Sequence, residues 1–496
     1  MRGIPCTTRG TGGVTSNGVR LRGAGAWAGI LCILGCFAAP GAGFAAPPGR
    51  GMALDSATEQ GDSIRVVTTG AEFVFQKTLG RITILQRIPA RRSLGLISGV
   101  PLAGVKLIRS STRECEIAGA PRGTALTVGS DSLLRIRLAG PADVAVEGAY
   151  EPQYRQQVRH DFFLPDEQGG LGMYLVSGEA RSELPASWKP NWSVRYHVGT
   201  PAELWVSAFP PKPFDWAQSR ETMLHSFSCK HPYPSDAELR AWRRYGSVLT
   251  LHSWVWKGSS GSRYGVEKDN SWTAGDFEPK SAEEFRRVVQ TAHSLGMKVI
   301  PYMSPYYAAR PTSEGINGFV RKVAQRKKEY GLDGVYFDGA AESVKTAYDA
   351  VVWTRQAIGD DGILHMHLTG VPTMVCPFID CHADYLLRGE HLGLSRDYAR
   401  WHVSCYNLGN SIGTFCYDRL RVSPSMIELV FSVHARLPCW VGDGTWNGAK
   451  YHLTEPEQQL MIREYYPRLR QEQKASNTAG GRAPSAKPAA ILRQEP

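Results

Sequence analysis

From Pro201 onward the chain alternates short apolar runs with amphipathic helical segments, and this alternation is the feature that most constrains its fold. Strands that alternate with helices are joined by right-handed crossovers and therefore run parallel. Eight strand candidates fit the pattern: Leu204–Ala208, Val248–Trp254, Lys298–Met303, Gly334–Asp338, Ile363–Leu368, Asp384–Gly389, Ser411–Tyr417 and Pro438–Gly442. Eight units over about 265 residues match the size of a (β/α)8 TIM barrel.

The segments between these strands carry helix signals of their own. Ser281-Ala-Glu-Glu284 has the form of a capping box, and Gly296 is a stop signal. Between them one apolar face is formed by Phe285, Val288, Val289, Ala292 and Leu295. Phe319, Val323 and Tyr330 form a similar face in the next unit, and a third helix is predicted from Ser343 to Ile358.

Residues 55–199 show a different pattern, with short alternating segments separated by turn residues. Examples are Ile64–Thr69, Glu72–Phe75, Gly80–Leu85, Leu133–Leu138 and Leu171–Val176. This pattern predicts an all-β sandwich domain ahead of a barrel domain at 200–466, so the fold class is α/β with a preceding β-sandwich. The acidic turn Asp166–Gly170 is most simply a loop, and calcium or sugar contact there is the alternative.

The two ends of the chain differ from the middle. Residues 1–45 have the layout of an export signal, with arginines up to Arg22 and an apolar segment from Ala26 to Ala39. Ile33-Leu34-Gly35-Cys36 also resembles a lipoprotein box, which would make the protein lipid-anchored. Residues 467–496 are rich in Gln, Ala, Gly and Pro and predict a disordered tail. We therefore expect a secreted or periplasmic protein with no membrane span.

The net charge of +11 lies mainly at the ends, because residues 1–45 and 468–496 carry +4 each and residues 46–467 carry only +3. No basic stripe remains for nucleic acid, and no nucleic-acid partner is expected. The seven cysteines after residue 45 form no CxxC pair, which leaves a zinc or redox motif unsupported. Cys376 and Cys381, which flank Pro377, are candidates for a disulfide across a loop.

Acidic residues follow several of the predicted strands. In a barrel Asp338 ends the fourth strand, Glu390 follows the sixth, Asp418 the seventh and Asp443 the eighth. Barrels place their chemistry at the C-terminal ends of their strands. Two facing carboxylates in different environments are the minimum equipment for cleaving a glycosidic bond. We therefore expect Asp338 and Glu390 to be catalytic, and Asp418 and Asp443 to bind the substrate.

Structural roles are the alternatives for these acids. Asp338 could cap a helix or brace a loop. Glu390 could pair with Arg388 or Arg396, while Arg388 is itself a candidate for fixing a sugar hydroxyl or a carboxylate.

Aromatic and histidine side chains around the same strand ends indicate a sugar ligand. Pyranose rings stack their apolar faces on aromatic planes while their hydroxyls seek polar partners. The expected substrate-binding residues are His252, Trp254, Tyr302, His365, His367, Arg388, Asp418, Trp440 and Asp443. A role in the core is the alternative for each aromatic ring. His252, His365 and His367 could instead form a hydrolytic metal site with an acid, although no metal or cofactor is expected.

With a β-sandwich before the barrel and acids after its fourth and sixth strands, the chain resembles the glycoside hydrolases related to alpha-galactosidases (melibiases). The resemblance covers the architecture of residues 55–465. It implies a retaining mechanism with Asp338 as the nucleophile and Glu390 as the general acid and base. Melibiases usually have Lys-x-Asp at the nucleophile and a second Asp, whereas this chain has Tyr336-Phe-Asp338 and Gly389-Glu390.

Asp333-Gly-Val-Tyr-Phe-Asp338 is also faintly similar to the chitinase strand signature, but the acid expected two residues further on is Ala340. The prediction is a secreted glycosidase acting on an oligosaccharide or polysaccharide. A non-catalytic carbohydrate-binding protein on the same scaffold and a metal-dependent hydrolase remain the alternatives. The sugar and its linkage do not follow from the sequence.

Overall fold

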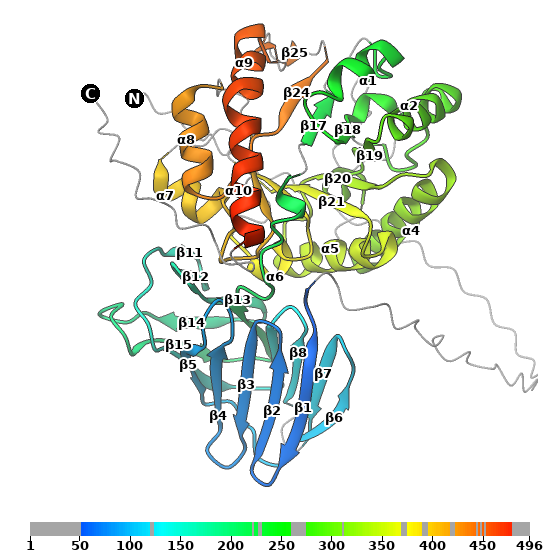
Figure 1. Ribbon diagram of the computed structural model, residues 1–496. Coiled ribbons are helices and arrows are strands. Elements are labelled where there is room, and N and C mark those ends of the chain that lie inside the picture. Colours follow the sequence, from blue (N-terminus) through cyan, green and yellow to red (C-terminus); the bar gives the residue numbers. More distant parts are fainter. Residues whose placement is uncertain are drawn as a thin grey trace, which may run out of the picture. The chain divides into compact units, whose positions relative to one another are not determined.

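The computed structural model describes residues 51–119, 124–220, 223–226, 231–258, 274–309, 312–368, 374–388, 395–416, 422–442, 445–446, 449–450 and 453–478 (Figure 1). This part of the chain is a mixed α/β structure with two eight-stranded antiparallel sheets and two four-stranded parallel sheets. The predicted export signal at 1–45 and residues 479–496 lie outside the described residues.

The two antiparallel sheets come from the first part of the chain. The first has the order β1-β2-β3-β4-β5-β10-β15-β14 and the second the order β11-β12-β13-β16-β9-β8-β7-β6. The strands of the first sheet are β1 Leu54–Gln60, β2 Ser63–Thr68, β3 Ala71–Gln76, β4 Arg81–Gln86, β5 Arg92–Ser98, β10 Ala142–Gly148, β14 Ala180–Glu183 and β15 Trp192–Val198. Those of the second are β6 Lys106–Ser110, β7 Glu114–Ala118, β8 Ala125–Gly129, β9 Leu133–Leu138, β11 Gln156–Val158, β12 Asp161–Asp166, β13 Gly169–Ser177 and β16 Ala202–Phe209.

The two sheets share one apolar core. Alternate residues of facing strands are buried in it, for example Phe73 and Phe75 on β3 and Leu134 and Ile136 on β9. Each large apolar side chain that is fully buried contributes about 1.5–3 kcal/mol relative to exposure. The alternation that predicted these strands from the sequence is thus confirmed.

The prediction that Leu204–Ala208 is the first parallel strand is wrong. These residues lie in β16, which pairs antiparallel with β13 and β9 in the second sheet. Because nearly every residue of β16 is buried, its sequence reads like that of a parallel strand. The first parallel strand is β17, Met223–Ser226, which the sequence analysis missed.

The remaining seven predicted parallel strands are confirmed, each within a few residues of the predicted ends. One parallel sheet has the order β19-β18-β17-β24 and the other the order β20-β21-β22-β23. Single parallel bridges link the outer strands of the two sheets, Tyr302 with Tyr336 and Thr414 with Arg436. The bounds are β18 Val248–Leu251, β19 Lys298–Pro301, β20 Gly334–Asp338, β21 Ile363–His367, β22 Tyr385–Arg388, β23 Ile412–Phe415 and β24 Cys439–Val441. A further hairpin consists of β25 Thr445–Trp446 and β26 Ala449–Lys450.

Side chains alternate between the two faces of these parallel strands. One face packs against the helices, as Val335 and Phe337 of β20 do. The other face forms a separate buried cluster, hereafter the inner cluster, whose members are Met223, Val248, Ile300, Tyr302, Tyr336, Ile363, Tyr385, Leu387, Ile412, Cys416 and Trp440. All eight parallel strands, or the residues next to their ends, contribute to the inner cluster. Its side chains therefore converge on one interior.

Helices separate the parallel strands in the sequence. The α-helices are α1 Asp236–Trp242, α2 Ala282–Ser294, α3 Pro305–Ala308, α4 Ser313–Tyr330, α5 Val344–Ile358, α6 Pro377–Asp380, α7 Arg396–Tyr398, α8 Pro424–Ser432, α9 Glu455–Leu460 and α10 Tyr466–Thr478. Two π-helical turns are η4 Ala399–Val403 and η5 Met461–Tyr465, and short 3-10 turns are η1 Gln218–Arg220 and η2 Ser253–Val255. The predicted α2, α4 and α5 are confirmed, and Ser281 caps α2 by accepting a hydrogen bond from the amide of Glu284. None of the helices among the described residues is long and apolar enough to cross a membrane.

The predicted disordered tail is wrong for residues 467–478, which belong to α10. Leu469 is buried in the core, and Glu472 pairs with the buried Arg436 at 2.6 Å. Tertiary contacts thus hold a segment whose composition alone gave no helix signal.

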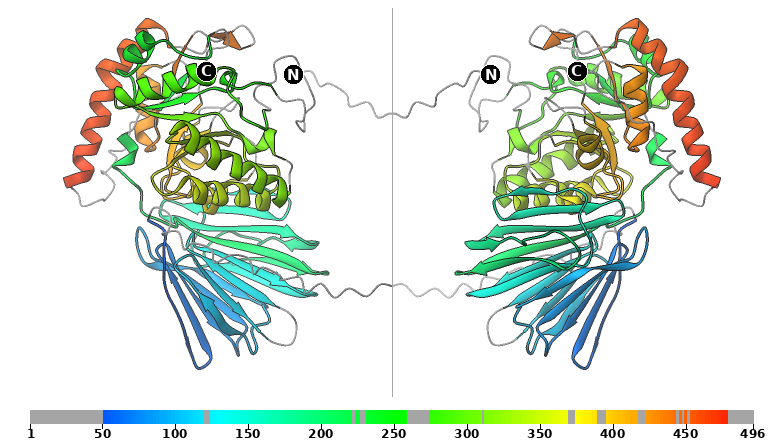
Figure 2. Two further views of the ribbon diagram at one scale, coloured as in Figure 1. Left: turned by 90° about the vertical axis from the view of Figure 1, so that its right-hand side faces the viewer. Right: turned by 90° about the vertical axis from the view of Figure 1, so that its left-hand side faces the viewer.

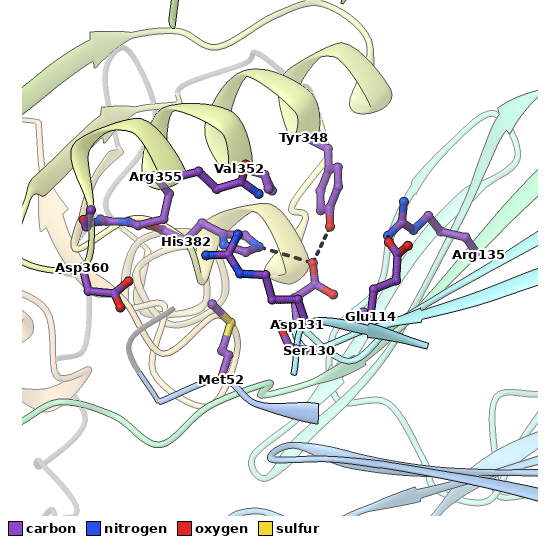
Figure 3. Close-up of a pocket in the computed structure, with 14 residues that line it drawn as sticks. Met52, Glu114, Ser130, Asp131, Arg135, Tyr348, Val352, Arg355, Asp360 and His382 are labelled. Atoms are coloured by element: carbon purple, nitrogen blue, oxygen red, sulfur yellow. Dashed lines mark hydrogen bonds and ion pairs between the residues drawn. The ribbon is translucent and has the colours of Figure 1, made fainter. Parts of the chain in front are cut away.

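The second antiparallel sheet packs against α5, and Figure 2 shows the yellow-green helices next to the cyan and green strands. At this junction the Tyr348 hydroxyl of α5 donates a 2.7 Å hydrogen bond to the buried carboxylate of Asp131, and Nε2 of His382 lies 3.3 Å from the same oxygen (Figure 3). A cavity of about 320 Å³ lies beside this contact. Burial raises the pKa of Asp131, but the neighbouring His382 and Arg135 lower it to below its ordinary value. The Asp131 carboxylate is therefore charged, and its charged form is stabilised by these partners.

The proposed disulfide between Cys376 and Cys381 is wrong, because both are free thiols. The turn of α6 separates them, and each thiol lies near a backbone carbonyl, that of Met374 for Cys376 and that of Phe378 for Cys381. The six cysteines among the described residues are all buried and unbridged.

We predict that Tyr348→Phe lowers the free energy of unfolding by about 1–3 kcal/mol, because a buried carboxylate loses its shortest hydrogen bond. Denaturant titration measures the change. Lys345→Met on the same helix is the control, since it removes only an exposed pair with Asp349 that is worth about 0.2–0.5 kcal/mol. Equal effects of the two variants would show that the Asp131 contact does not hold the junction.

Candidate functional site

Asp338 is the last residue of β20, and the backbone around it is shaped by glycines. Gly334 begins the strand, and a Cβ there would lie 1.9 Å from the carbonyl oxygen of Ile363. Gly339 follows Asp338 with φ of +81°, and a Cβ there would meet the ring of Tyr306 at 3.0 Å. The Ser304 hydroxyl lies 2.6 Å from the carbonyl oxygen of Asp338 and braces the turn. The chain therefore leaves β20 sharply and holds Asp338 at the strand end.

Two side chains of neighbouring strands hold the Asp338 carboxylate. The Tyr302 hydroxyl donates to Oδ2 at 3.0 Å, and Nδ1 of His367 lies 3.0 Å from Oδ1. The Asp338 side chain is nevertheless 31% exposed, whereas that of His367 is only 9% exposed. The Asp338 carboxylate thus reaches solvent, whereas the two side chains that hold it are buried.

The electrostatics favour an ion pair between Asp338 and His367. Burial raises the pKa of Asp338, but the hydrogen bond and charge of His367, with help from His252 and Tyr302, lower it to below its ordinary value of 3.8. Burial lowers the pKa of His367, but Asp338 and the thiol of Cys416 raise it well above 6.5. Each group thus favours the charged form of the other near neutral pH.

Three further histidines near this pair are neutral. Burial lowers the pKa of His252 to about 4 and that of His365 to about 3, and it lowers the pKa of His225 well below 6.5. His225 is stacked on Trp440 with ring centroids 4.2 Å apart, and its edge contacts Tyr336. Among the described residues, the site is therefore one ion pair surrounded by neutral, mainly aromatic groups.

The structure brings several of the sequence-predicted site residues together. Tyr302 and His367 contact Asp338 directly, and His252 lies next to Tyr302 with ring centroids 5.1 Å apart. Trp254 stacks on His252. His365 shares its strand face with His367 and contacts Tyr336 one layer below Asp338. Trp440 belongs to the inner cluster, so it packs in the interior and has no place on an open surface.

The structure does not bring Arg388 to this group. Its guanidinium is buried, and Nη2 donates to both oxygens of Asp380 at 2.9 Å. Leu387 belongs to the inner cluster, whereas Leu386, which shares its strand face with Arg388, packs with the helices. Arg388 therefore points away from the interior because strand parity turns it outward, and the predicted sugar contact is replaced by a structural ion pair.

Glu390, Asp418 and Asp443 all lie outside the described residues, so the second carboxylate of the predicted pair is not described. Within the described ranges, no group of three His, Cys, Asp or Glu side chains is arranged to hold a metal ion.

The Asp166 carboxylate lies in the turn for which calcium or sugar contact is the alternative to a simple loop. In the structure this carboxylate binds an arginine. Both carboxylate oxygens of Asp166 pair with Arg92, one of them at 2.8 Å.

Sequence reasoning missed three members of the group, His225, Tyr336 and Cys416. Side chains two residues apart on a strand share a face. If Asp338 is known to point into the interior, Tyr336 must point there too. In the same way, the inward direction of Ile412 predicts that of Cys416. His225 was hidden because β17 itself was missed.

Comparisons with known proteins give limited likenesses. No protein-family model and no curated protein matches the chain. Among solved structures it is similar to a noncanonic maltogenic alpha-amylase, AmyB, from Thermotoga neapolitana, with 14% identity and a TM-score of 0.37 over 52% of this chain and 78% of that chain. It is also similar to a variant of the alpha-galactosidase AgaA from Geobacillus stearothermophilus, with 8% identity and a TM-score of 0.40 over 85% of this chain and 71% of that chain. An uncharacterised protein from Listeria monocytogenes shows 9% identity and a TM-score of 0.39 over 87% of this chain and 56% of that chain. Likenesses at this level assign no activity to the chain.

We predict that Asp338→Asn lowers the pKa of His367, because the burial that disfavours the imidazolium remains while its carboxylate partner is gone. NMR titration of protein with labelled histidine side chains measures this, and His367→Gln assigns the signal. Asp333→Asn, at the other end of the same strand, should leave the signal unchanged. An unaltered His367 titration in Asp338→Asn would contradict the ion pair.

The same pair predicts two limits of pH stability. The folded-state pKa of Asp338 lies below 3.8, so its contribution is complete above that value and is lost as the pH falls through the lower folded-state pKa. The folded-state pKa of His367 lies above 6.5, so its contribution is complete below 6.5 and is lost as the pH rises through the higher folded-state pKa. Wild-type protein should therefore lose more stability at both extremes than Asp338→Asn does.

Proposed function

We propose that the protein is a glycoside hydrolase in which Asp338 is the nucleophile. The observation that carries this proposal is the Asp338 carboxylate, which is held by two partners, favours its charged form and is 31% exposed among buried neighbours. A nucleophilic carboxylate must be ionised at the working pH, pointed at the substrate and restrained from rotating. The contacts with Tyr302 and His367 keep the Asp338 carboxylate from rotating. Its position at the end of β20 points it toward the substrate.

The architecture is consistent with this role. We infer that the eight parallel strands form one closed (β/α)8 barrel, supported by the two bridges between the sheets and by the inner cluster that all eight strands share. Counted from β17, Asp338 ends the fourth strand, at the end where barrels carry chemistry. We likewise infer that the two antiparallel sheets form a β-sandwich domain, with the domain boundary after Phe209 and not at residue 199, because β16 belongs to the sandwich.

The sugar would bind on the solvent side of the Asp338 carboxylate, at the C-terminal end of β20. Trp254 stacks on His252 beside Tyr302 and is a candidate platform for a pyranose face. The neutral imidazole of His252 can donate a hydrogen bond to a sugar hydroxyl or accept one from it, without adding a charge to the site. Glu390 remains the proposed acid and base, with Asp418 and Asp443 as proposed substrate contacts. Carboxyl groups about 5 Å apart would give retention, and a separation of about 6.5–9.5 Å would give inversion.

Export remains part of the proposal. The arrangement of arginines and apolar residues in 1–45 supports a cleaved signal and thus a secreted or periplasmic enzyme, with lipid anchoring through Cys36 as the other outcome. Analysis of the mature N-terminus separates the two.

A non-catalytic carbohydrate-binding protein is the second candidate. The observation that favours it is that both oxygens of Asp338 already accept hydrogen bonds, which lowers the reactivity of the carboxylate. Such a protein would bind sugars in wild type and in Asp338→Asn alike, and neither would release product.

We predict that wild-type protein hydrolyses at least one member of a panel of aryl glycosides and polysaccharides, and that Asp338→Asn lowers kcat by about 10³-fold or more. The amide has nearly the same size as the acid but no charge with which to attack. Product release is measured by absorbance and by chromatography.

Asp333→Asn is the matched control, because Asp333 precedes the same strand and its Oδ2 accepts the amide of Val299 at the opposite end. It should retain wild-type turnover. Full activity of Asp338→Asn would end the assignment. Activity of Asp338→Ala that returns with added azide, with formation of a glycosyl azide, would identify the lost group as the nucleophile.

A further inference from the structure

A cavity of about 440 Å³ lies at the opposite end of the parallel strands from Asp338. Its walls come from the turn between β12 and β13, from α7 and η4, and from the end of α8 with the residues that follow it. Arg436 bridges Thr414 in parallel, so His434, two residues earlier, is level with Ile412, the first residue of β23. The cavity wall formed by His434 is therefore at the N-terminal ends of the strands, whereas Asp338 is at a C-terminal end.

The turn between β12 and β13 is fixed against this end of the parallel strands. The Nδ2 amide of Asn407 donates to the carbonyl oxygen of Glu167 at 2.7 Å, and the Glu167 carboxylate lies 3.3 Å from Nη2 of Arg400. Nearby, the Tyr154 hydroxyl lies 2.7 Å from Nε2 of His402. Glu167 belongs to the acidic turn for which sugar contact was an alternative, and it lines the cavity although its neighbour Asp166 is bound to Arg92.

Arg400 is held rigidly in the cavity wall. Its guanidinium lies 4.6 Å from the centre of the Trp401 ring, and Nη1 donates to the carbonyl oxygen of Tyr406 at 3.0 Å. The side chain is only 14% exposed, whereas that of its partner Glu167 is 62% exposed. A guanidinium in such a position can donate to a ligand without first losing rotational freedom.

The Tyr406 ring is a second rigid element of the wall. Its centre lies 4.6 Å from that of His434, 5.3 Å from that of Phe214 and 5.8 Å from that of Trp216. The ring is only half-buried and lines the cavity. A fixed aromatic ring with an exposed part is a platform for the apolar face of a sugar ring.

The charges of the cavity wall balance. Arg396 and Arg400 carry two positive charges, and Glu167 and Asp397 carry two negative charges. The wall therefore attracts neither anions nor cations strongly, and this favours an uncharged ligand with many hydroxyl groups. Gln153, Arg396 and Asp397 are exposed at the cavity, and their side chains make no hydrogen bond to the described residues. They supply both donors and acceptors for such hydroxyls.

We propose that this cavity is a non-catalytic binding site for an uncharged oligosaccharide. Tyr406 stacks on a sugar ring, and Gln153, Asp397 and Arg400 bind its hydroxyls. The volume is within the range of about 300–1,000 Å³ that is usual for small-molecule sites. The site goes beyond the proposed cleavage and does not depend on Asp338, because the two lie at opposite ends of the strands.

The test is hydrogen–deuterium exchange of the full-length chain, followed by peptide mass spectrometry. Maltohexaose, cellohexaose, xylohexaose and mannohexaose are added separately at millimolar concentration to the Asp338→Asn variant, which keeps the probes intact. We expect at least one of them to slow exchange in the peptides that cover 153–167 and 396–406. The concentration dependence of this protection gives Kd.

Two pairs of variants in the same background identify the groups that bind. Tyr406→Ala should raise Kd about tenfold, whereas Tyr406→Phe, which keeps the ring, should leave it unchanged. Asp397→Asn should raise Kd about threefold or more, because a charged hydrogen-bond acceptor is lost. Asp361→Asn is the matched control, since Asp361 is equally exposed but does not line the cavity.

The proposal is overturned if none of the four oligosaccharides protects these peptides, or if protection is confined to peptides next to Asp338. Equal Kd values for Tyr406→Ala and Tyr406→Phe would also overturn it. Circular dichroism shows whether each variant is folded, and the Asp397→Asn and Asp361→Asn pair decides the matter if Tyr406→Ala does not fold. Protection here without any hydrolysis by wild-type protein would contradict the proposed cleavage alone, and hydrolysis of aryl glycosides without protection here would contradict this site alone.

Discussion

The site depends on the alternation of side chains along parallel strands. Residues two apart share a face, so each strand that points one residue into the interior also points the residue two positions later there. On β20 this parity places Tyr336 in the inner cluster and Asp338 above it at the strand end. On β21 it stacks His367 over His365. The lower layers are apolar or aromatic, and charge is confined to the strand ends, where water can reach it.

Burial decides which of these groups carries a charge. Removing an imidazole from water disfavours its protonated form, and this effect wins at His225, His252 and His365, although the charge of Asp338 opposes it at His252 and that of Asp384 opposes it at His365. At His367 the contact with Asp338 outweighs the same desolvation. One ion pair among neutral rings is thus the consequence of a single 3.0 Å contact. The proposed attack by Asp338 relies on it.

Much of the fold follows from the sequence, because periodicity records which face of an element is buried. Seven of the eight parallel strands and the cap of α2 were predictable for this reason. The exceptions have physical causes. β16 is buried on both faces of an antiparallel sheet and so lacks alternation, and α10 is held by Leu469 and Glu472 through contacts that no local pattern records.

In the site, Asp338, Tyr302 and His367 were predictable from strand ends. The outward turn of Arg388 toward Asp380 required knowledge of strand parity, and the positions of His225 and Cys416 required knowledge of which strands neighbour theirs in the parallel sheets.

Covalent trapping tests most directly whether the Asp338 carboxylate attacks the substrate as the nucleophile. Activated fluorosugars form long-lived glycosyl esters with a nucleophilic carboxylate, because the fluorine slows the second step of a double displacement. After incubation with a panel of such sugars and proteolysis, the account predicts one glycosylated peptide, with the ester on Asp338. An ester on any other carboxylate, or turnover with no ester under any of these sugars, would contradict it.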